Sequence, residues 1–464
     1  MTQQQTPPPA PVLDPDRVAA LRARVAAQFP TVRADLDALV RIPSVSNQEF
    51  DQGQLTASAE AVAALLTSVG FAPVDVLTAM RPDGTSGAPA VVGHRAGRPG
   101  APTVLLYAHH DVQPPGEGWA TEPFAPTQVG DRLFGRGAAD DKAGVAAHIG
   151  ALRVLGDELG AHVTVFVEGE EEVGSPSFVD FLHTYRDRLA ADVIVVADSS
   201  NWKVGVPGLT TSLRGLVDLV VEVAVLDHAV HSGMFGGPIL DAPTLLARLI
   251  ATLHDDAGDV AVAGLVRAPD PAVDYDEAEL RADAGVLDGV RLAGTGPLTA
   301  RLWTRPAISV IGLDAPRVAT SSNTLTPVAS AKLSLRIAPG QDPAAARDAL
   351  VAHLLAHAPF GARVSVRDGE LGKPFAAPLD SAAMRTARAA FAAAWGTEPV
   401  DIGIGGSIPF IADLLDVFPQ AAILVTGVED PDGRAHGANE SVHLVELERV
   451  VLAEALMLDA LARD

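Results

Sequence analysis

The sequence of 464 residues predicts an α/β fold, a mixed and mostly parallel sheet flanked by helices, with a smaller ferredoxin-like α+β domain inserted into it. Three almost wholly apolar runs, at residues 102–109, 162–168 and 192–198, are typical of strands buried on both faces. Between such runs lie segments with helical spacing of apolar residues. From about residue 212 the order becomes strand, helix, strand, strand, helix, strand, as in a ferredoxin-like domain.

The first part of the chain alternates helical and strand-like segments, which indicates an α/β sheet. Asp14 and Pro15 stand at the start of the first helical segment, where an N-cap and a first-turn proline belong. The segment 141–159 is rich in Ala and Leu, which favour helices. The expected helices cover residues 14–42, about 57–69 and 141–159, and the expected strands cover residues 88–94, 102–109, 162–168 and 192–198.

The second part contains the inserted domain and then returns to the larger one. In the insertion, strands are expected at residues 215–225, 307–313, 331–339 and 361–369, and helices at 242–253 and 342–357. After it, helices at 384–396 and 444–462 and strands at 399–407 and 420–428 resume the α/β pattern. The simplest division is a disordered, proline-rich tail at 1–14, a large domain formed by 15–207 and 373–464, and an inserted domain at 208–372.

The composition excludes several kinds of site and partner. The 34 Lys and Arg stand against 58 Asp and Glu, a formal charge of −24 that would repel nucleic acid. Without Cys, disulfides and thiolate metal sites are impossible. The N-terminal residues lack the cationic start and apolar run of a secretory signal, and no run approaches the roughly 18 apolar residues of a membrane span. We therefore expect a cytoplasmic protein with no nucleic-acid or membrane partner.

Acidic and imidazole side chains follow three of the expected buried strands. The first strand ends in His109 and Asp111, the second leads into the glutamates at 170–172, and the third ends in Asp198. Ligands of open α/β sheets bind at the carboxyl ends of the strands, so these groups are expected at one edge. Residues two apart on a strand share a face, which suits a metal-binding His109 oriented by Asp111.

Several carboxylates in one cleft repel one another unless cations neutralise them. Since no Cys is available, His, Asp and Glu ligands suit Zn²⁺, Mn²⁺ or Co²⁺. Asp140 and Asp141 precede the helix at 141–159, and one helix cap needs only one acid, so Asp141 is the expected N-cap and Asp140 the candidate ligand. The run EGEEEVGS, taken alone, could equally be a solvated loop.

Seven motifs, in order, give the sequence a family resemblance. They are YAHHDVQPP, LFGRGAADDKAG, EGEEEVGS, VVADSSNW, HSGMFGG, GGSIP and HGANESVHL. Together they resemble the dinuclear zinc metallopeptidase family of carnosine-type dipeptidases, glutamate carboxypeptidase, aminoacylase and succinyl-diaminopimelate desuccinylase, and most of all its dipeptidase branch. The resemblance implies that the large domain is catalytic and that the inserted one is a lid and dimerisation domain.

The resemblance also implies two divalent metal ions, Zn²⁺ first and Mn²⁺ or Co²⁺ as alternatives. His109 and Asp198 would hold one ion, Glu172 and His436 the other, and Asp140 would bridge them.

Two further residues receive catalytic roles from the resemblance. Asp111 would orient His109, and Glu171 would be the general base that takes a proton from a water bridging the ions. The family also places a cis peptide after the bridging aspartate, here between Asp140 and Asp141.

Four residues match substrate-contacting positions of the family: His231, Thr324, Arg336 and Ser407. Two departures accompany them. Val230 precedes His231 where dipeptidases typically have Asp, and Gly403-Ile404 stands where Arg-Glu often precedes the glycines of GGSIP.

The function implied is metal-dependent hydrolysis of the amide bond of dipeptides or short peptides, by a homodimer. The alternative on the same fold is an amidohydrolase that deacylates N-acyl amino acids, for which Gly403-Ile404 leaves room. A non-catalytic metal-binding protein is the alternative from another class, but it would have no need of Glu171.

Overall fold

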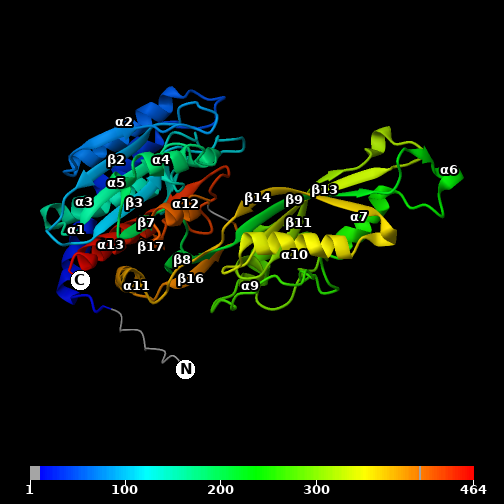
Figure 1. Ribbon diagram of the computed structural model, residues 1–464. Helices are drawn as coiled ribbons and strands as arrows, with labels where there is room; N and C mark the ends of the chain where they lie inside the picture. The colour runs from blue at the N-terminus through cyan, green and yellow to red at the C-terminus, as the bar shows by residue number, and fades with distance from the viewer. Residues whose placement is uncertain (1–10, 407–408, 464) are drawn as a thin grey trace. The chain divides into compact units, whose positions relative to one another are not determined.

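The computed structural model describes residues 11–406 and 409–463 (Figure 1). Of the predicted tail at 1–14, the first ten residues therefore lie outside the described part, and so does Ser407. The chain divides into two compact units. The first comprises Met1–Thr211, Ala377–Ile402 and Asp413–Asp464, and the second comprises Ser212–Ala376 and Gly403–Ala412.

The first unit contains most of a nine-stranded sheet with the order β1-β2-β6-β3-β7-β17-β8-β15, in which β16 also pairs with β8. Its strands are β1 (Val74–Leu77), β2 (Ala90–Arg95), β3 (Thr103–His109), β6 (His162–Glu168), β7 (Val193–Val196), β8 (Gly208–Leu213), β15 (Phe375–Ala376), β16 (Val400–Ile404) and β17 (Ala422–Val425). The neighbours β6, β3, β7 and β17 run parallel, and the outer strands pair antiparallel. This centre positions the site, because the parallel strands all end at one edge.

Helices cover the sheet, so nearly every residue of β3 and β6 is buried. They are α1 (Pro15–Val40), α2 (Gly53–Ser68), α3 (Lys142–Leu155), α4 (Phe178–Thr184), α5 (Arg186–Leu189), α11 (Ala382–Trp395), α12 (Pro409–Val417) and α13 (Leu444–Leu461). α1, α3 and α13 pack together, and the rings of Phe178 and Phe181 in α4 stack on Phe166 of β6. The expected helix at 141–159 ends at Leu155, because Gly156 takes a positive φ of 50° and a short 3-10 turn follows.

A three-stranded sheet joins two distant parts of the first unit. It consists of β4 (Thr127–Val129), β5 (Arg132–Phe134) and β18 (Ser441–His443), in the order β18-β5-β4. β18 pairs antiparallel with β5, with Val442 opposite Leu133. This pairing places the loop before β18 beside the loop after β5.

The second unit contains an antiparallel sheet with the order β11-β13-β9-β14. Its elements are β9 (Gly215–Ala224), α7 (Ala242–Ala251), β11 (Ala307–Asp314), β13 (Val328–Ile337), α10 (Pro343–Ala356) and β14 (Arg363–Gly372). Alternate residues of β9, from Val217 to Val223, are buried with apolar residues of α7 and α10, which cover one face of the sheet (Figure 1). The order and directions are those of the predicted ferredoxin-like arrangement.

Shorter elements complete the second unit. They are β10 (Val230–His231), α6 (Ser232–Phe235), α8 (Glu277–Asp283), α9 (Leu298–Trp303) and β12 (Thr324–Leu325). The segment Gly403–Ala412 belongs to this unit, whereas the sequence predicts it in the large domain. The physical reason is local: Arg214 donates its backbone N–H to the carbonyl of Ile404 and its guanidinium to that of Gly405.

These features confirm the predicted fold class, a mixed sheet with a parallel centre and flanking helices. Among the described residues, no helix combines the length and apolar character needed to cross a bilayer.

Candidate metal centre

The carboxyl ends of β3, β6 and β7 bring together two groups of potential metal ligands. One group is His109, Asp140 and Asp198, and the other is Asp140, Glu172 and His436. Within each group, one nitrogen or oxygen atom of every residue lies within 4.8 Å of the others. Asp140 belongs to both groups, so the five predicted ligands form one cluster.

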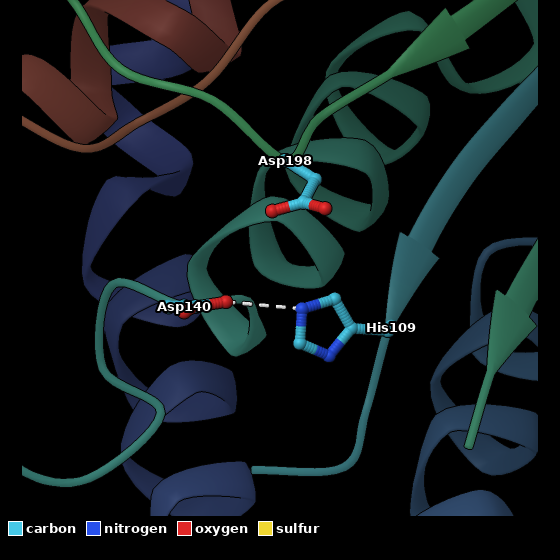
Figure 2. A group of neighbouring side chains, drawn as sticks. All are labelled: His109, Asp140 and Asp198. Atoms are coloured by element: carbon cyan, nitrogen blue, oxygen red, sulfur yellow. Dashed lines mark hydrogen bonds and ion pairs between the residues drawn. The ribbon is translucent and has the colours of Figure 1, made fainter. Parts of the chain in front are cut away.

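His109 ends β3, and its ring lies between two aspartates. Its Nδ1 is 3.1 Å from the backbone carbonyl of Asp111, an atom that only accepts, so Nδ1 carries the proton. Its Nε2 is 3.0 Å from Oδ1 of Asp140, and Asp198 lies next to this pair, as Figure 2 shows. Without a metal ion, Asp140 also favours a proton on Nε2 and so raises the pKa of His109; a bound metal ion would take the place of that proton, with Nδ1 still donating to Asp111.

Asp140 lies in the loop before α3, and its two oxygens face different imidazoles. Oδ1 contacts His109, and Oδ2 is 3.0 Å from Nε2 of His436. The Asp140–Asp141 peptide is cis. Asp141 is the N-cap of α3, as expected, and accepts from the backbone N–H of Gly144 and of His109.

Glu172 and His436 complete the second group. Glu172 lies in a single 3-10 turn after β6, and its Oε2 is 3.1 Å from Nε2 of His436. His436 lies in the loop between β17 and β18 and has a positive φ of 60°. Its side chain is 60% exposed, whereas that of Glu172 is 3% exposed. The second group is therefore open on the side of its imidazole.

Asp111 makes more contacts than the sequence predicts, because its buried carboxylate also binds the turn after β6, the neighbouring strand in the sheet. Oδ1 lies 3.3 Å from Nδ1 of His109 and accepts from the backbone N–H of Glu171. Oδ2 accepts from the backbone N–H of Glu172. One side chain thus orients a candidate ligand and positions the turn that carries the candidate base.

Gln113 is a residue of the site that the sequence reasoning missed. Its side-chain amide donates to Oε2 of Glu172 at 2.9 Å and to the backbone carbonyl of Glu172 at 3.0 Å. Its backbone N–H donates to Oε1 at 3.1 Å. Gln113 lies within the motif YAHHDVQPP, so the sequence marks it as a candidate, but the motif does not indicate that Glu172 is its hydrogen-bond partner.

The glutamates at 170–172 separate into different environments. Glu170 is buried, pairs with Arg81 at 2.8 Å and belongs to neither ligand group. Removal from water raises the pKa of Glu171 to about 8, and the charges of Asp198 and Glu172 add to the shift. A carboxyl group perturbed in this way and placed beside a ligand cluster has the properties of an acid–base catalyst.

The charges of the ligands also show that the cluster suits cations. Burial raises the pKa of Asp198 to about 7, with the charge of Asp140 adding to it. Hydrogen bonds to Asp140 and Glu172 raise the pKa of His436 to about 11. In the absence of metal ions, bound protons therefore offset the negative charge of the crowded carboxylates. Divalent ions offset this charge better, and imidazole nitrogens and carboxylate oxygens are suitable ligands for them. The donor set fits Zn²⁺, Mn²⁺ or Co²⁺.

The chain also matches known proteins. The sequence pattern of peptidase family M20/M25/M40 matches residues 105–460. The chain belongs to this family. A cysteinylglycine-S-conjugate dipeptidase of Corynebacterium striatum is 37% identical over 366 residues, which cover 76% of this chain and 80% of that protein.

Two human comparisons agree with this assignment. The human beta-Ala-His dipeptidase is 29% identical over 397 residues, covering 80% of this chain and 78% of that protein. The crystal structure of human carnosine dipeptidase 1 superposes with a TM-score of 0.73 at 25% identity, covering 98% and 100% of the two chains. The prediction of a dipeptidase-like, metal-dependent peptidase of this family is confirmed.

Three of the four residues that the family resemblance assigns to substrate lie in the second unit, namely His231, Thr324 and Arg336. His231 and Thr324 are direct neighbours across the antiparallel pair β10 and β12. Arg336 lies on β13 opposite Leu216 of β9. Ser407 lies outside the described residues, so its placement stays a prediction.

Arg214 is a second residue that the sequence reasoning missed. Its buried guanidinium donates to the backbone carbonyls of Gly405, Arg301 and Arg305. Burial, together with the nearby charge of Arg336, lowers the pKa of Arg214 to about 10. Among the described residues, neither Arg214 nor Arg336 has a carboxylate partner. Their two charges therefore produce a positive potential that favours an anion.

Proposed function

We propose that this M20 peptidase hydrolyses dipeptides and short peptides at a centre of two divalent metal ions. His109, Asp140 and Asp198 would hold one ion, and Asp140, Glu172 and His436 the other. The observation that carries the proposal is the position of Asp140, whose two oxygens face His109 on one side and His436 on the other. A carboxylate in that position can serve two ions.

The metal ions, when bound, would polarise the scissile carbonyl and make a nearby water more acidic. We propose Zn²⁺, with Mn²⁺ or Co²⁺ as alternatives, because the ligands are imidazole and carboxylate groups. A related protein of Candida albicans, 27% identical over 443 residues, is a Cys-Gly metallodipeptidase, which supports a metal-dependent dipeptidase.

Glu171 would transfer a proton from the attacking water to the leaving nitrogen. Its carboxylate takes one proton from the attacking water, whose oxygen bonds to the amide carbon, and gives it to the nitrogen when the C–N bond breaks. Its pKa of about 8 lies near neutral pH, and bound cations would favour its charged form. Asp111 supports this role because it holds the backbone N–H of Glu171.

We propose that His231, Thr324, Arg336 and Ser407 contact the substrate. The positive potential of Arg214 and Arg336 supports recognition of a substrate carboxylate. We also propose a homodimer formed by the second unit, where Val310, Ile311 and Leu313 of the edge strand β11 are exposed. A cytoplasmic location stays a prediction.

Deacylation of N-acyl amino acids is the second candidate, and one observation favours it. Gly403 stands where dipeptidases often have Arg, and a Cβ there would lie 2.6 Å from Cβ of Trp303. A long side chain at this position therefore does not fit, so any contact that the arginine makes in dipeptidases must be replaced or absent here.

A metal-resolved assay tests the proposal. The metal-free protein is loaded separately with Zn²⁺, Mn²⁺ and Co²⁺ and given dipeptides and N-acyl amino acids. We expect dipeptide hydrolysis with at least one ion and two ions bound per chain. Hydrolysis of N-acyl amino acids alone would favour the second candidate, and no hydrolysis of either would leave a metal-binding protein.

The variant Glu171→Gln separates catalysis from binding. It should still bind two ions, because Glu171 is in neither ligand group, but lose the activity by roughly a factor of 10² to 10⁴, the usual contribution of a general base. Loss of a metal ion from this variant would contradict the assigned role.

A further inference from the structure

Glu440 is a buried acid that belongs to neither ligand group. It lies directly before β18 and is fully buried. Its Oε2 accepts from Nη1 of Arg136 at 2.5 Å and from the backbone N–H of Gly137 at 3.0 Å. Its Oε1 accepts from the backbone N–H of Ala139 at 2.9 Å and of Asp140 at 3.1 Å. Four donors therefore surround one carboxylate, two at each oxygen.

These contacts join two loops that are far apart in the sequence. Glu440 stands in the same loop as His436, and its carboxylate holds the loop that ends in Asp140. Arg136 strengthens the junction, because it also donates to the backbone carbonyl of Gly437 at 3.1 Å. The two candidate ligands that face each other across the second group are thus attached to one another through Glu440.

The His436 loop needs such attachment. Arg434, His436 and Asn439 all have positive φ, a conformation that costs a non-glycine residue about 1–2 kcal/mol. Asn439 is fixed on the other side, where its side chain accepts from the N–H of Ala120 and donates to the carbonyl of Gly118. The loop therefore keeps its shape because contacts on both sides hold it.

We propose that Glu440 is a positioning residue that sets the separation of Asp140 and His436, and with it the affinity of the second metal group. The inference rests on the proposed two-metal function. A glutamine at this position could not replace the acid, because its amide has one accepting oxygen and its NH₂ group would face two N–H donors.

The test is a metal titration of the metal-free protein, first with Zn²⁺ against a chromophoric chelator and then with Co²⁺ by visible absorption. For Glu440→Gln we expect the weaker of the two binding constants to fall by roughly tenfold or more, the effect of losing a hydrogen bond to a charged group. We also expect the activity of this variant to return at high metal concentration, whereas that of Glu171→Gln should not.

The control is Glu454→Gln, which removes another buried acid, one that pairs with His148 in the same unit. It should change the stability of the fold and leave both metal affinities unchanged. If Glu440→Gln does not fold, Glu440→Asp takes its place, because it keeps the charge while shortening the side chain by one methylene.

The outcomes separate the two proposals. Two ions in the wild-type protein, bound with equal affinity by a folded Glu440 variant, would overturn the role of Glu440 and leave the proposed function intact. A wild-type protein that binds fewer than two ions would overturn both.

Discussion

Single side chains in this site hold groups from several strands at once. Asp111 contacts His109 from its own strand end and the N–H groups of Glu171 and Glu172 after the next strand. Gln113 does the same for the carboxylate of Glu172. The ligands are therefore pre-arranged by hydrogen bonds, which lowers the cost of ordering them when a metal ion binds.

The contribution of Gln113 can be measured. Gln113→Leu removes the donor to Oε2 of Glu172, and we expect the affinity of the second metal group to fall by roughly tenfold to a hundredfold, as expected for a bond to a charged group. Isothermal titration of the metal-free variant measures this change.

Gln54→Leu is the matched control for that measurement, because Gln54 also donates to a carboxylate, that of Asp51, outside the site. It should bind both ions as the wild type does. Equal loss of affinity in the two variants would show that Gln113 has no specific role.

The sequence predicted the candidate metal ligands better than the residues that hold them in place by hydrogen bonds. His109, Glu172 and Asp198 follow strands whose ends must meet, so their proximity follows from the fold class. Gln113 and Glu440 stand in motifs that are just as visible, but their partners lie in other segments of the chain. Such contacts depend on the packing of loops, for which a single sequence carries no local pattern.

At the level of elements, most helices and strands were predictable from apolar spacing, and their ends were predictable to within a few residues. α3 stops at Leu155 because Gly156 leaves the helical region, although the apolar pattern continues. The grouping of Gly403–Ala412 with the second unit was not predicted, because it depends on the hydrogen bonds of Arg214 to Ile404 and Gly405. Contacts between segments distant in the sequence are set by tertiary structure.

A buried ion pair links two of these elements. His148 of α3 directs Nδ1 to the carboxylate of Glu454 in α13 and Nε2 to the backbone carbonyl of Tyr107. Both ring nitrogens face acceptors, so both carry protons and the ring is charged. Burial alone would lower the pKa of His148, but Glu454 outweighs it and raises the pKa above 6.5.

The pair predicts a pH-dependent stability. His148→Gln should lower the free energy of unfolding by roughly 3–5 kcal/mol near pH 6, because it leaves Glu454 buried without its cation. The pKa of His148 is higher in the folded than in the unfolded state, so the charged pair contributes its full stabilisation below about pH 6.5. This stabilisation is lost as the pH rises through the folded-state pKa. The difference between variant and wild type should therefore shrink as the pH rises through the folded-state pKa, as measured by urea unfolding of the metal-free proteins over a pH series that starts near pH 6.

His353→Gln provides the comparison of opposite sign. Burial lowers the pKa of His353 in the folded state, so protonation of His353 decreases the stability of the fold as the pH falls below about 6.5. Replacing His353 with Gln should remove this decrease in stability at low pH. A His148→Gln difference that stays the same across the whole pH series would contradict the charged pair.

At the scale of the whole molecule, the proposed dimer is the property that remains to be measured. Val310, Ile311 and Leu313 are 43%, 55% and 60% exposed on the edge strand β11, an apolar surface typical of an interface. We expect light scattering at micromolar concentration to give twice the mass of one chain. Ile311→Lys should shift the protein toward single chains, because a charge in an apolar interface loses its hydration.

Val129→Lys is the control, since Val129 is 59% exposed on β4 in the other unit. It should leave the mass unchanged. A wild-type protein that scatters as a single chain would exclude the dimer.

The interrupted path of the chain has a consequence for biosynthesis. β7 has β3 on one side and β17 on the other, and β17 follows only after the whole insertion. At roughly 5–20 residues per second, the ribosome needs on the order of 10 to 50 s to reach β17 after completing β7. During that time an apolar strand at the centre of the final sheet has an open edge, and His436 does not yet exist. A nascent chain of this protein therefore passes through a period in which it can aggregate through that edge and can hold no more than the first group of ligands.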